Sequence, residues 1–211
     1  MRTSLIILLL FILSLRSASG QALFGLSKDS LRVVTASAPD DTLKVGTLIA
    51  LGQQFETNQP DSAVYFYQLA GRLARRLGDH AGYIRYISNY TAVLNMRGKY
   101  DESLQLNLGT IDTCLKYHLG GMSYIRALTN TGNVYELIGN HDSSAVYYLK
   151  ALPEVEASGD GYRITVIYSN LSGLYRSLHQ SSKALDYSRK ALRQAEKIGD
   201  RYSIASAHIN M

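Results

Sequence analysis

A signature of about 40 residues recurs along the chain and limits its fold more than any other feature. Glycine, asparagine and tyrosine each keep this period, with spacings between 38 and 42 residues. The recurring residues are Gly78, Gly120, Gly159, Gly199, Asn89, Asn130, Asn170, Asn210, Tyr83, Tyr124, Tyr162 and Tyr202. Three residue types in one phase predict stacked supersecondary units that bury their apolar faces against their neighbours. Such a stack favours a binding scaffold over an enzyme.

The first twenty residues have the order of a secretory signal peptide. Arg2 precedes an apolar run from Leu5 to Leu15, and small residues then lead to Gly20. The run is short for a membrane span, which needs about 20 residues. We predict cleavage near Gly20 and an exported mature chain that is periplasmic or faces the periplasm. An uncleaved membrane anchor is the alternative.

Composition excludes several classes of function. The chain carries 22 Lys+Arg and 17 Asp+Glu; residues 1–20 hold two of the arginines and no acid, so the mature balance is 20 against 17 and the net charge falls from +5 to +3. So small a charge does not indicate a nucleic-acid partner. Cys114 is the only cysteine, which excludes an intrachain disulfide and a multi-cysteine zinc site. A membrane contact is expected only through a span that would follow the given sequence.

Each period has the pattern of two helices joined by a short turn. In 121–157, apolar residues keep helical spacing on both sides of a polar turn, where Asp142 or Ser143 is expected to cap the second helix. Pro153 is expected to kink this helix or end it early. A leader segment at 21–41 contains a short helix. The repeats are expected at about 42–79, 80–120, 121–159 and 160–199, with a partial repeat at 200–211.

These residues resemble the tetratricopeptide repeat, whose motif places a small residue and an aromatic on the first helix and alanines on the second. The matching residues are Gly132, Tyr135, Ala145, Tyr148, Ala151 and Leu152; Ser172, Tyr175, Ala184, Tyr187, Ala191 and Leu192; and Gly52, Phe55, Ala63, Tyr67 and Ala70. The second repeat departs, with Thr91, Leu94, Ser103 and Thr110 at the motif positions. The resemblance covers roughly residues 42–211. It implies an all-α, right-handed solenoid of antiparallel helix pairs.

The resemblance also implies a binding face. First helices line the concave side of such solenoids, and asparagines at this motif position bond the backbone of an extended peptide. The implied groove contains Asn89, Asn130, Asn170 and, next in line, Asn210. Arg85 and Arg126 each precede an asparagine by four residues, so they share its helix face and are candidates to pair with a ligand carboxylate. The alternative, that the asparagines bridge neighbouring repeats, stays open.

No catalytic, metal or cofactor site is predicted. The five histidines fall near loops or helix ends, and no two have the i, i+4 spacing of a helical metal site. Phosphate-binding glycine loops and nucleophile elbows are absent from the sequence. Cys114 lies among apolar neighbours and is expected to be a small core residue. We therefore expect no enzyme activity in this segment, although a kinase domain could follow it in a longer protein.

The organisation suggests a context for the scaffold. Residues 202–211 begin a first helix whose partner does not follow, so we expect the sequence to be a piece of a longer protein. A signal peptide, a short leading helix and long repeats are similar to the exported sensor regions of bacterial histidine kinases and related regulators. The expected function is to bind a peptide or protein on the concave face, as the sensing part of a signal-transduction protein. The alternatives are a free-standing periplasmic assembly adaptor, or the non-catalytic part of an enzyme that continues beyond Met211.

Overall fold

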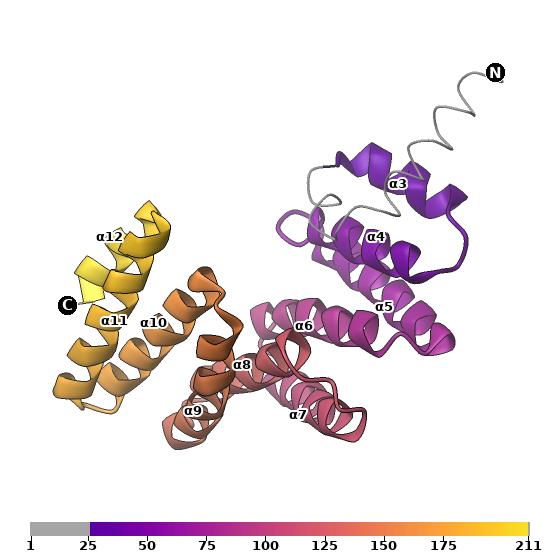
Figure 1. The fold of residues 1–211 in the computed structure, drawn as a ribbon. Coiled ribbons are helices and arrows are strands. Elements are labelled where there is room, and N and C mark those ends of the chain that lie inside the picture. Colours follow the sequence, from indigo (N-terminus) through magenta and orange to yellow (C-terminus); the bar gives the residue numbers. More distant parts are fainter. Residues whose placement is uncertain (1–25, 211) are drawn as a thin grey trace. The chain divides into compact units, whose positions relative to one another are not determined.

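The computed structural model describes residues 26–210, which form helices and turns without any strand (Figure 1). The helices are α3 (Lys28–Ser37), α4 (Thr42–Gln53), α5 (Pro60–Leu77), α6 (His80–Met96), α7 (Tyr100–Lys116), α8 (Met122–Leu137), α9 (His141–Ser158), α10 (Gly161–Ser177), α11 (Ser181–Ile198) and α12 (Arg201–Asn210). This confirms the predicted all-α fold of helix pairs. Within the described range, no helix is both long and apolar enough to cross a membrane. The predicted signal peptide lies outside the described residues.

Most helices begin and end as the local sequence indicates. The side chains of Asp41, Asp79 and Asp160 each accept a hydrogen bond from the backbone N–H three residues later, which satisfies one of the free donors of the first turn. At the other end, Gly78 and Gly159 follow their helices in the left-handed conformation, with φ of 66° and 67°. Capping side chains and left-handed glycines therefore mark several of the helix ends.

Two helix ends have a histidine in the left-handed conformation. His118 and His179 have φ of 52° and 55°, and they occupy the position that Gly78 takes after α5. The loop after α7 departs from the predicted glycine loop, because the other positive φ there belongs to Gly121 and not to Gly120. A left-handed conformation costs a non-glycine residue about 1 kcal/mol or more, so these two turns carry strain.

The α9 helix differs from the prediction at its start and in its middle. Asn140 is the cap, and its Oδ1 accepts from the Ser143 backbone N–H at 3.0 Å; the helix begins one residue before Asp142. The expected early end at Pro153 is wrong, since the helix continues to Ser158. Pro153 is exposed, and so is Leu149 one turn earlier, so the carbonyl that loses its helical partner lies on the solvent side.

The second helices share one buried stripe with the spacing i, i+4, i+7 and i+11. Its members are Ala63, Tyr67, Ala70 and Ala74 in α5; Ser103, Asn107, Thr110 and Cys114 in α7; Ser144, Tyr148, Ala151 and Val155 in α9; and Ala184, Ser188, Ala191 and Ala195 in α11. Two motif assignments are therefore corrected, because Ser144 replaces Ala145 and Ser188 replaces Tyr187 on the buried face. Cys114 is a stripe residue, which confirms that it is a core residue.

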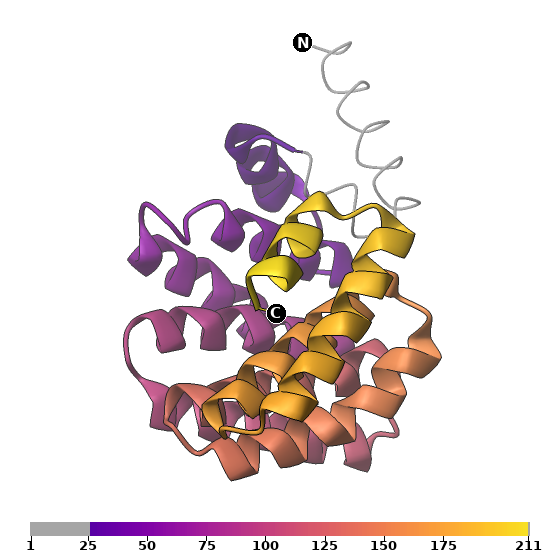
Figure 2. The ribbon, with the colours of Figure 1, turned by 90° about the vertical axis from the view of Figure 1, so that its left-hand side faces the viewer.

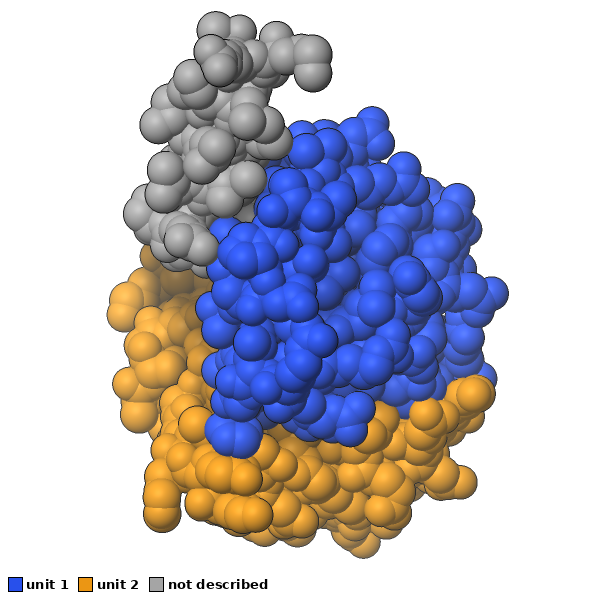
Figure 3. All heavy atoms as spheres, turned by 90° about the vertical axis from the view of Figure 1, so that its right-hand side faces the viewer, with its two compact units in different colours: residues 1–97 blue, residues 98–211 orange. Residues whose placement is uncertain are grey.

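The chain divides into two compact units, residues 1–97 and residues 98–211 (Figure 3). In unit 1, α3 packs on α4 through Leu31 and Val34, and α4 is buried from Val45 to Gly52. Gly52 permits this packing, since a Cβ at this position would lie 2.4 Å from the Tyr67 ring of α5. The absence of a side chain at Gly52 therefore leaves room for the Tyr67 ring of the paired helix.

Unit 2 repeats this arrangement, with α9, α10 and α11 packed side by side in chain order (Figure 2). A Cβ on Gly132 of α8 would lie 2.6 Å from the fully buried Tyr148 ring of α9. Tyr175 stacks on Tyr187 and Tyr135 on Tyr147, with centroids 5.6 and 5.4 Å apart. The remaining predicted structural residues, Ala63, Ala70, Ala151, Ala184 and Ala191, are all buried.

The boundary between the units falls inside the second predicted repeat, in the turn that contains Gly98. This is the repeat that departs from the motif. Thr91 stands at the position of Gly132, and its hydroxyl donates to the backbone oxygen of Ile87 in its own helix. Asn107 stands at the position of Tyr148, and its amide donates to the backbone oxygen of Ser103. Each of these two side chains therefore bonds to the backbone of its own helix.

Candidate functional site

Asn89 of α6 forms a bridge within unit 1. Its Nδ2 donates to the Arg85 backbone oxygen at 2.8 Å, and its Oδ1 accepts from Nε2 of Gln53 at 2.8 Å. Gln53 ends α4, the first helix of the preceding pair. Both ends of the Asn89 amide are thus engaged, and the contact joins neighbouring first helices.

Asn170 of α10 forms the corresponding bridge in unit 2. Its Nδ2 donates to Oδ1 of Asn133 in α8 at 3.2 Å. The Tyr148 hydroxyl lies 2.6 Å from the same Asn133 oxygen and 2.8 Å from Oε2 of Glu136. Burial, together with the nearby Glu136 carboxylate, raises the pKa of Tyr148 well above its ordinary value, so the hydroxyl remains a donor. This network ties α8, α9 and α10 together.

Asn130 of α8 has no such bridge. The residue after the small motif position is Gln53 in the first repeat and Asn133 in the third, but it is Ala92 in the second. Alanine cannot supply a bridging amide. No side-chain hydrogen bond joins Asn130 to another residue in the described part of the chain, and its side chain lines a cavity of unit 2. Asn130 therefore has a free amide in a hollow of the surface.

This cavity, which we call the α8–α10 pocket, has a volume of about 180 Å³. Its lining residues are Ile125, Arg126, Thr129 and Asn130 of α8, Val155 of α9, and Tyr162, Arg163, Val166 and Ile167 of α10. Ile125, Val155 and Ile167 are buried and form an apolar floor. The rim is polar, and no acidic residue is part of the lining.

The charge of the α8–α10 pocket is positive. Arg126 and Arg163 contribute two guanidinium groups. Asp160 is the nearby counter-charge, with Oδ2 3.2 Å from Nε of Arg163, while its Oδ1 caps α10. Asp160 thus both caps α10 and pairs with Arg163. An apolar floor below an amide and two guanidinium groups suits an apolar side chain next to a carboxylate.

The structure distributes the predicted groove residues between the two units. Arg85 and Asn89 belong to unit 1, and Arg126, Asn130 and Asn170 belong to unit 2. Asn210 lies in α12, but its side chain is outside the described residues. Only Arg126 and Asn130 of this set line the α8–α10 pocket. Their close neighbours Thr129, Tyr162 and Arg163 were missed as site residues, because Tyr162 was interpreted as a packing mark and Arg163 belongs to no recurring pattern.

The described residues offer little for redox or metal chemistry. No three His, Cys, Asp or Glu side chains among them gather closely enough to hold a metal ion. Burial raises the pKa of the Cys114 thiol, so this cysteine is not an activated nucleophile.

Comparisons with known proteins agree with this architecture. The model of the tetratricopeptide repeat matches residues 123–197, which include almost all of α8 to α11. No curated protein matches the sequence. Solved structures are similar in fold. BtubC (BKLC) from P. vanneervenii is 17% identical, with a TM-score of 0.66, and the match covers 89% of this chain and 75% of that one.

Two further structures belong to longer proteins. A Rap protein complexed with Competence and Sporulation Factor is 16% identical, with a TM-score of 0.69, over 84% of this chain and 50% of that one. A Signal Transduction ATPase with Numerous Domains that carries a tetratricopeptide repeat sensor, from Pyrococcus horikoshii, is 20% identical, with a TM-score of 0.70, over 85% and 28%. The match thus spans half or less of the length of each of these two proteins. Residues 123–197 thus match the tetratricopeptide repeat, and the helix pairs and buried stripe of the described chain have the fold of such repeats.

Proposed function

We propose that this protein is an exported scaffold that binds an extended peptide, or an extended segment of a protein partner, at the α8–α10 pocket. The observation that supports this most is the state of the Asn130 amide. The equivalent amides of Asn89 and Asn170 are engaged in bridges between first helices, whereas Asn130 has no such bridge among the described residues and lines a cavity that two arginines also line. A free amide on the lining of a pocket is available to a ligand.

The chemistry of the pocket defines the bound segment. The Asn130 amide can accept from a peptide N–H and donate to a peptide C=O at the same time, so it recognises backbone. Arg126 and Arg163 suit a carboxylate that lies two or three bonds from the bound peptide backbone. The floor formed by Ile125 and Val155 takes one apolar side chain of the peptide. A volume of about 180 Å³ accommodates a side chain and not a whole ligand, so the rest of the peptide would lie along the surface.

The sensing role is a finer part of the proposal. It is supported by the signal-peptide order of residues 1–20 and by the architectural similarity to exported sensor regions. Two proteins of similar fold are in keeping with this role, since one is complexed with Competence and Sporulation Factor and the other is a signal transduction ATPase with a tetratricopeptide repeat sensor. DNA that encodes a membrane span and a kinase core after Met211 would support the sensor. A stop codon there would favour the adaptor.

A display experiment tests the binding function. A random peptide library would be selected against mature protein that starts at Gln21, and the enriched peptides measured by calorimetry. We expect Asn130→Ala to weaken binding by roughly tenfold, because about two hydrogen bonds are lost. Asn89→Ala is the matched control, which should lower the melting temperature and leave the affinity unchanged. Unchanged affinity in Asn130→Ala, or no enrichment of any peptide, would refute the proposed site.

A further inference from the structure

Unit 1 contains a second cavity, which we call the α3–α5 pocket, with a volume of about 440 Å³. Its lining residues are Thr35 of α3, Asp40 of the turn before α4, Lys44 and Leu48 of α4, and Leu69, Arg72, Leu73 and Arg76 of α5. Pockets for small organic ligands have volumes of about 300–1,000 Å³. The α3–α5 pocket therefore has room for a whole small molecule, unlike the pocket that contains Asn130.

The walls of this pocket separate apolar from charged surface. Leu48 and Leu73 are 4% and 6% exposed, and they form an apolar floor with the partly buried Leu69. The rim holds three cations, Lys44, Arg72 and Arg76, and one acid. An apolar floor under an excess of positive charge suits an amphipathic anion.

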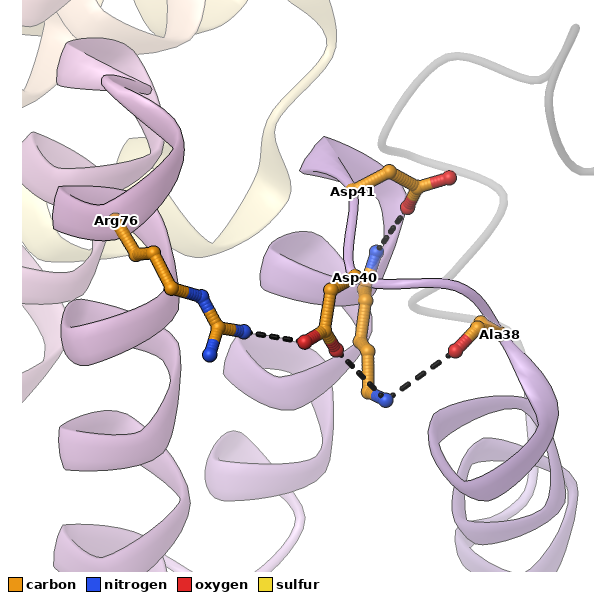
Figure 4. Close-up of polar contacts among 5 residues, drawn as sticks. Ala38, Asp40, Asp41 and Arg76 are labelled. Atoms are coloured by element: carbon orange, nitrogen blue, oxygen red, sulfur yellow. Dashed lines mark hydrogen bonds and ion pairs between the residues drawn. The ribbon is translucent and has the colours of Figure 1, made fainter.

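The acid on this rim already has two partners (Figure 4). Asp40 Oδ1 lies 3.1 Å from Nζ of Lys44, and its Oδ2 pairs with Nη2 of Arg76. Nζ of Lys44 also donates to the Ala38 backbone oxygen at 3.2 Å. These contacts hold the pKa of Asp40 below its ordinary value, chiefly through Lys44, so the carboxylate stays charged. A single carboxylate balances only one of the three cations.

Arg72 is the cation that this network does not use. No ion pair, hydrogen bond or ring contact connects its side chain to another residue in the part of the chain that the structure describes. It lies four residues before Arg76 on the same face of α5, where the two like charges repel each other. The neighbouring Arg75 differs, because its guanidinium lies 5.6 Å from the centroid of the Tyr83 ring. Arg75 has a structural contact, and Arg72 has none.

We propose that the α3–α5 pocket binds a small organic anion with an apolar tail, such as a carboxylate of about ten carbons. The anionic head pairs with Arg72 and with the half-occupied guanidinium of Arg76. The tail lies on Leu48, Leu69 and Leu73. This site is independent of peptide binding at Asn130, since it uses other residues in another unit.

Calorimetric titration of mature protein with decanoate tests this site. Decanoate should bind and raise the melting temperature, and decyltrimethylammonium, which has the same tail with a positive head, should do neither. We expect Arg72→Gln to weaken decanoate binding at least tenfold, since a charge-assisted contact in the pocket is lost. Arg75→Gln, one residue away with the same loss of charge, is the matched control and should bind as the unsubstituted protein does.

Three results would overturn the assignment. These are the absence of decanoate binding at millimolar concentration, equal binding of the two decyl compounds, and equal losses in Arg72→Gln and Arg75→Gln. Circular dichroism of both variants checks that they are folded. Asn130→Ala should bind decanoate normally, so failure of the peptide site and failure of this site are distinguishable.

Discussion

The contact between Gly132 and Tyr148 allows a sharp test of the packing. In Gly132→Ala, the new Cβ would lie 2.6 Å from two carbons of the Tyr148 ring, about 1 Å short of van der Waals contact. The ring cannot retreat easily, because it is 1% exposed and its hydroxyl is held by Asn133 and Glu136. Overpacking of this kind costs about 1–3 kcal/mol.

A second glycine separates this cost from helix propensity. Gly173 lies inside α10, and a Cβ there would meet nothing within 4 Å. Alanine is better than glycine in a helix interior by about 1 kcal/mol at both positions. Gly173→Ala should therefore gain up to about 1 kcal/mol of unfolding free energy, while Gly132→Ala should lose about 1 kcal/mol. The difference between the two variants isolates the overpacking, and it should be about 1–3 kcal/mol.

Urea unfolding followed by circular dichroism measures both variants. A third variant, Gly132→Ala with Tyr148→Leu, should show non-additive free energies, because the second change removes the ring that the methyl group meets. The reasoning would be refuted if Gly132→Ala and Gly173→Ala shifted stability in the same direction by similar amounts. It would also fail if the double variant were simply additive.

Three further outcomes are expected. His179→Gly should raise the unfolding free energy by about 1 kcal/mol, because it relieves a left-handed φ; an unchanged urea midpoint would contradict this. Asn133→Ala should lower the melting temperature more than Asn130→Ala, since only Asn133 bridges helices in the described structure; equal shifts would argue against the bridge. Burial and Glu156 raise the pKa of Tyr168 to about 12, so its contribution to stability is complete below pH 10 and is lost as the pH rises towards 12. Tyr168→Phe should flatten the fall in stability over this range, as followed by unfolding at each pH.

Local features of the fold could be predicted from the sequence because their causes are local. Helical spacing and polar turn residues act within one or two turns of chain, so the helix pairs followed directly from the sequence. The prediction that α9 ends early at Pro153 was wrong, because the effect of a proline inside a helix also depends on the tertiary structure. The free-energy cost of Pro153 depends on whether the carbonyl that loses its hydrogen bond faces solvent. The buried side of α9 decides which way that carbonyl faces.

The choice between adjacent residues needed the tertiary structure. Ser144 and Ala145 are both small, and each fits the motif within one residue. Only the position of α9 against its neighbours shows that Ser144 is fully buried and Ala145 is not. In the same way, Arg163 contributes to the α8–α10 pocket because α10 packs beside α8 and α9, which no spacing within a single helix encodes.

The sequence by itself determined that the chain repeats about every 40 residues, that each repeat is a helix pair, and that an asparagine recurs on the first helices from the second repeat onward. The sequence could not assign a separate role to each asparagine, because all of them occupy the same position of the repeat. The roles depend on partners 36 or 37 residues away, with Gln53 facing Asn89 and Asn133 facing Asn170. A hydrogen bond needs its donor and acceptor within about 3 Å of each other. Only the packing of helices decides which amides meet that condition and which, like Asn130 among the described residues, do not.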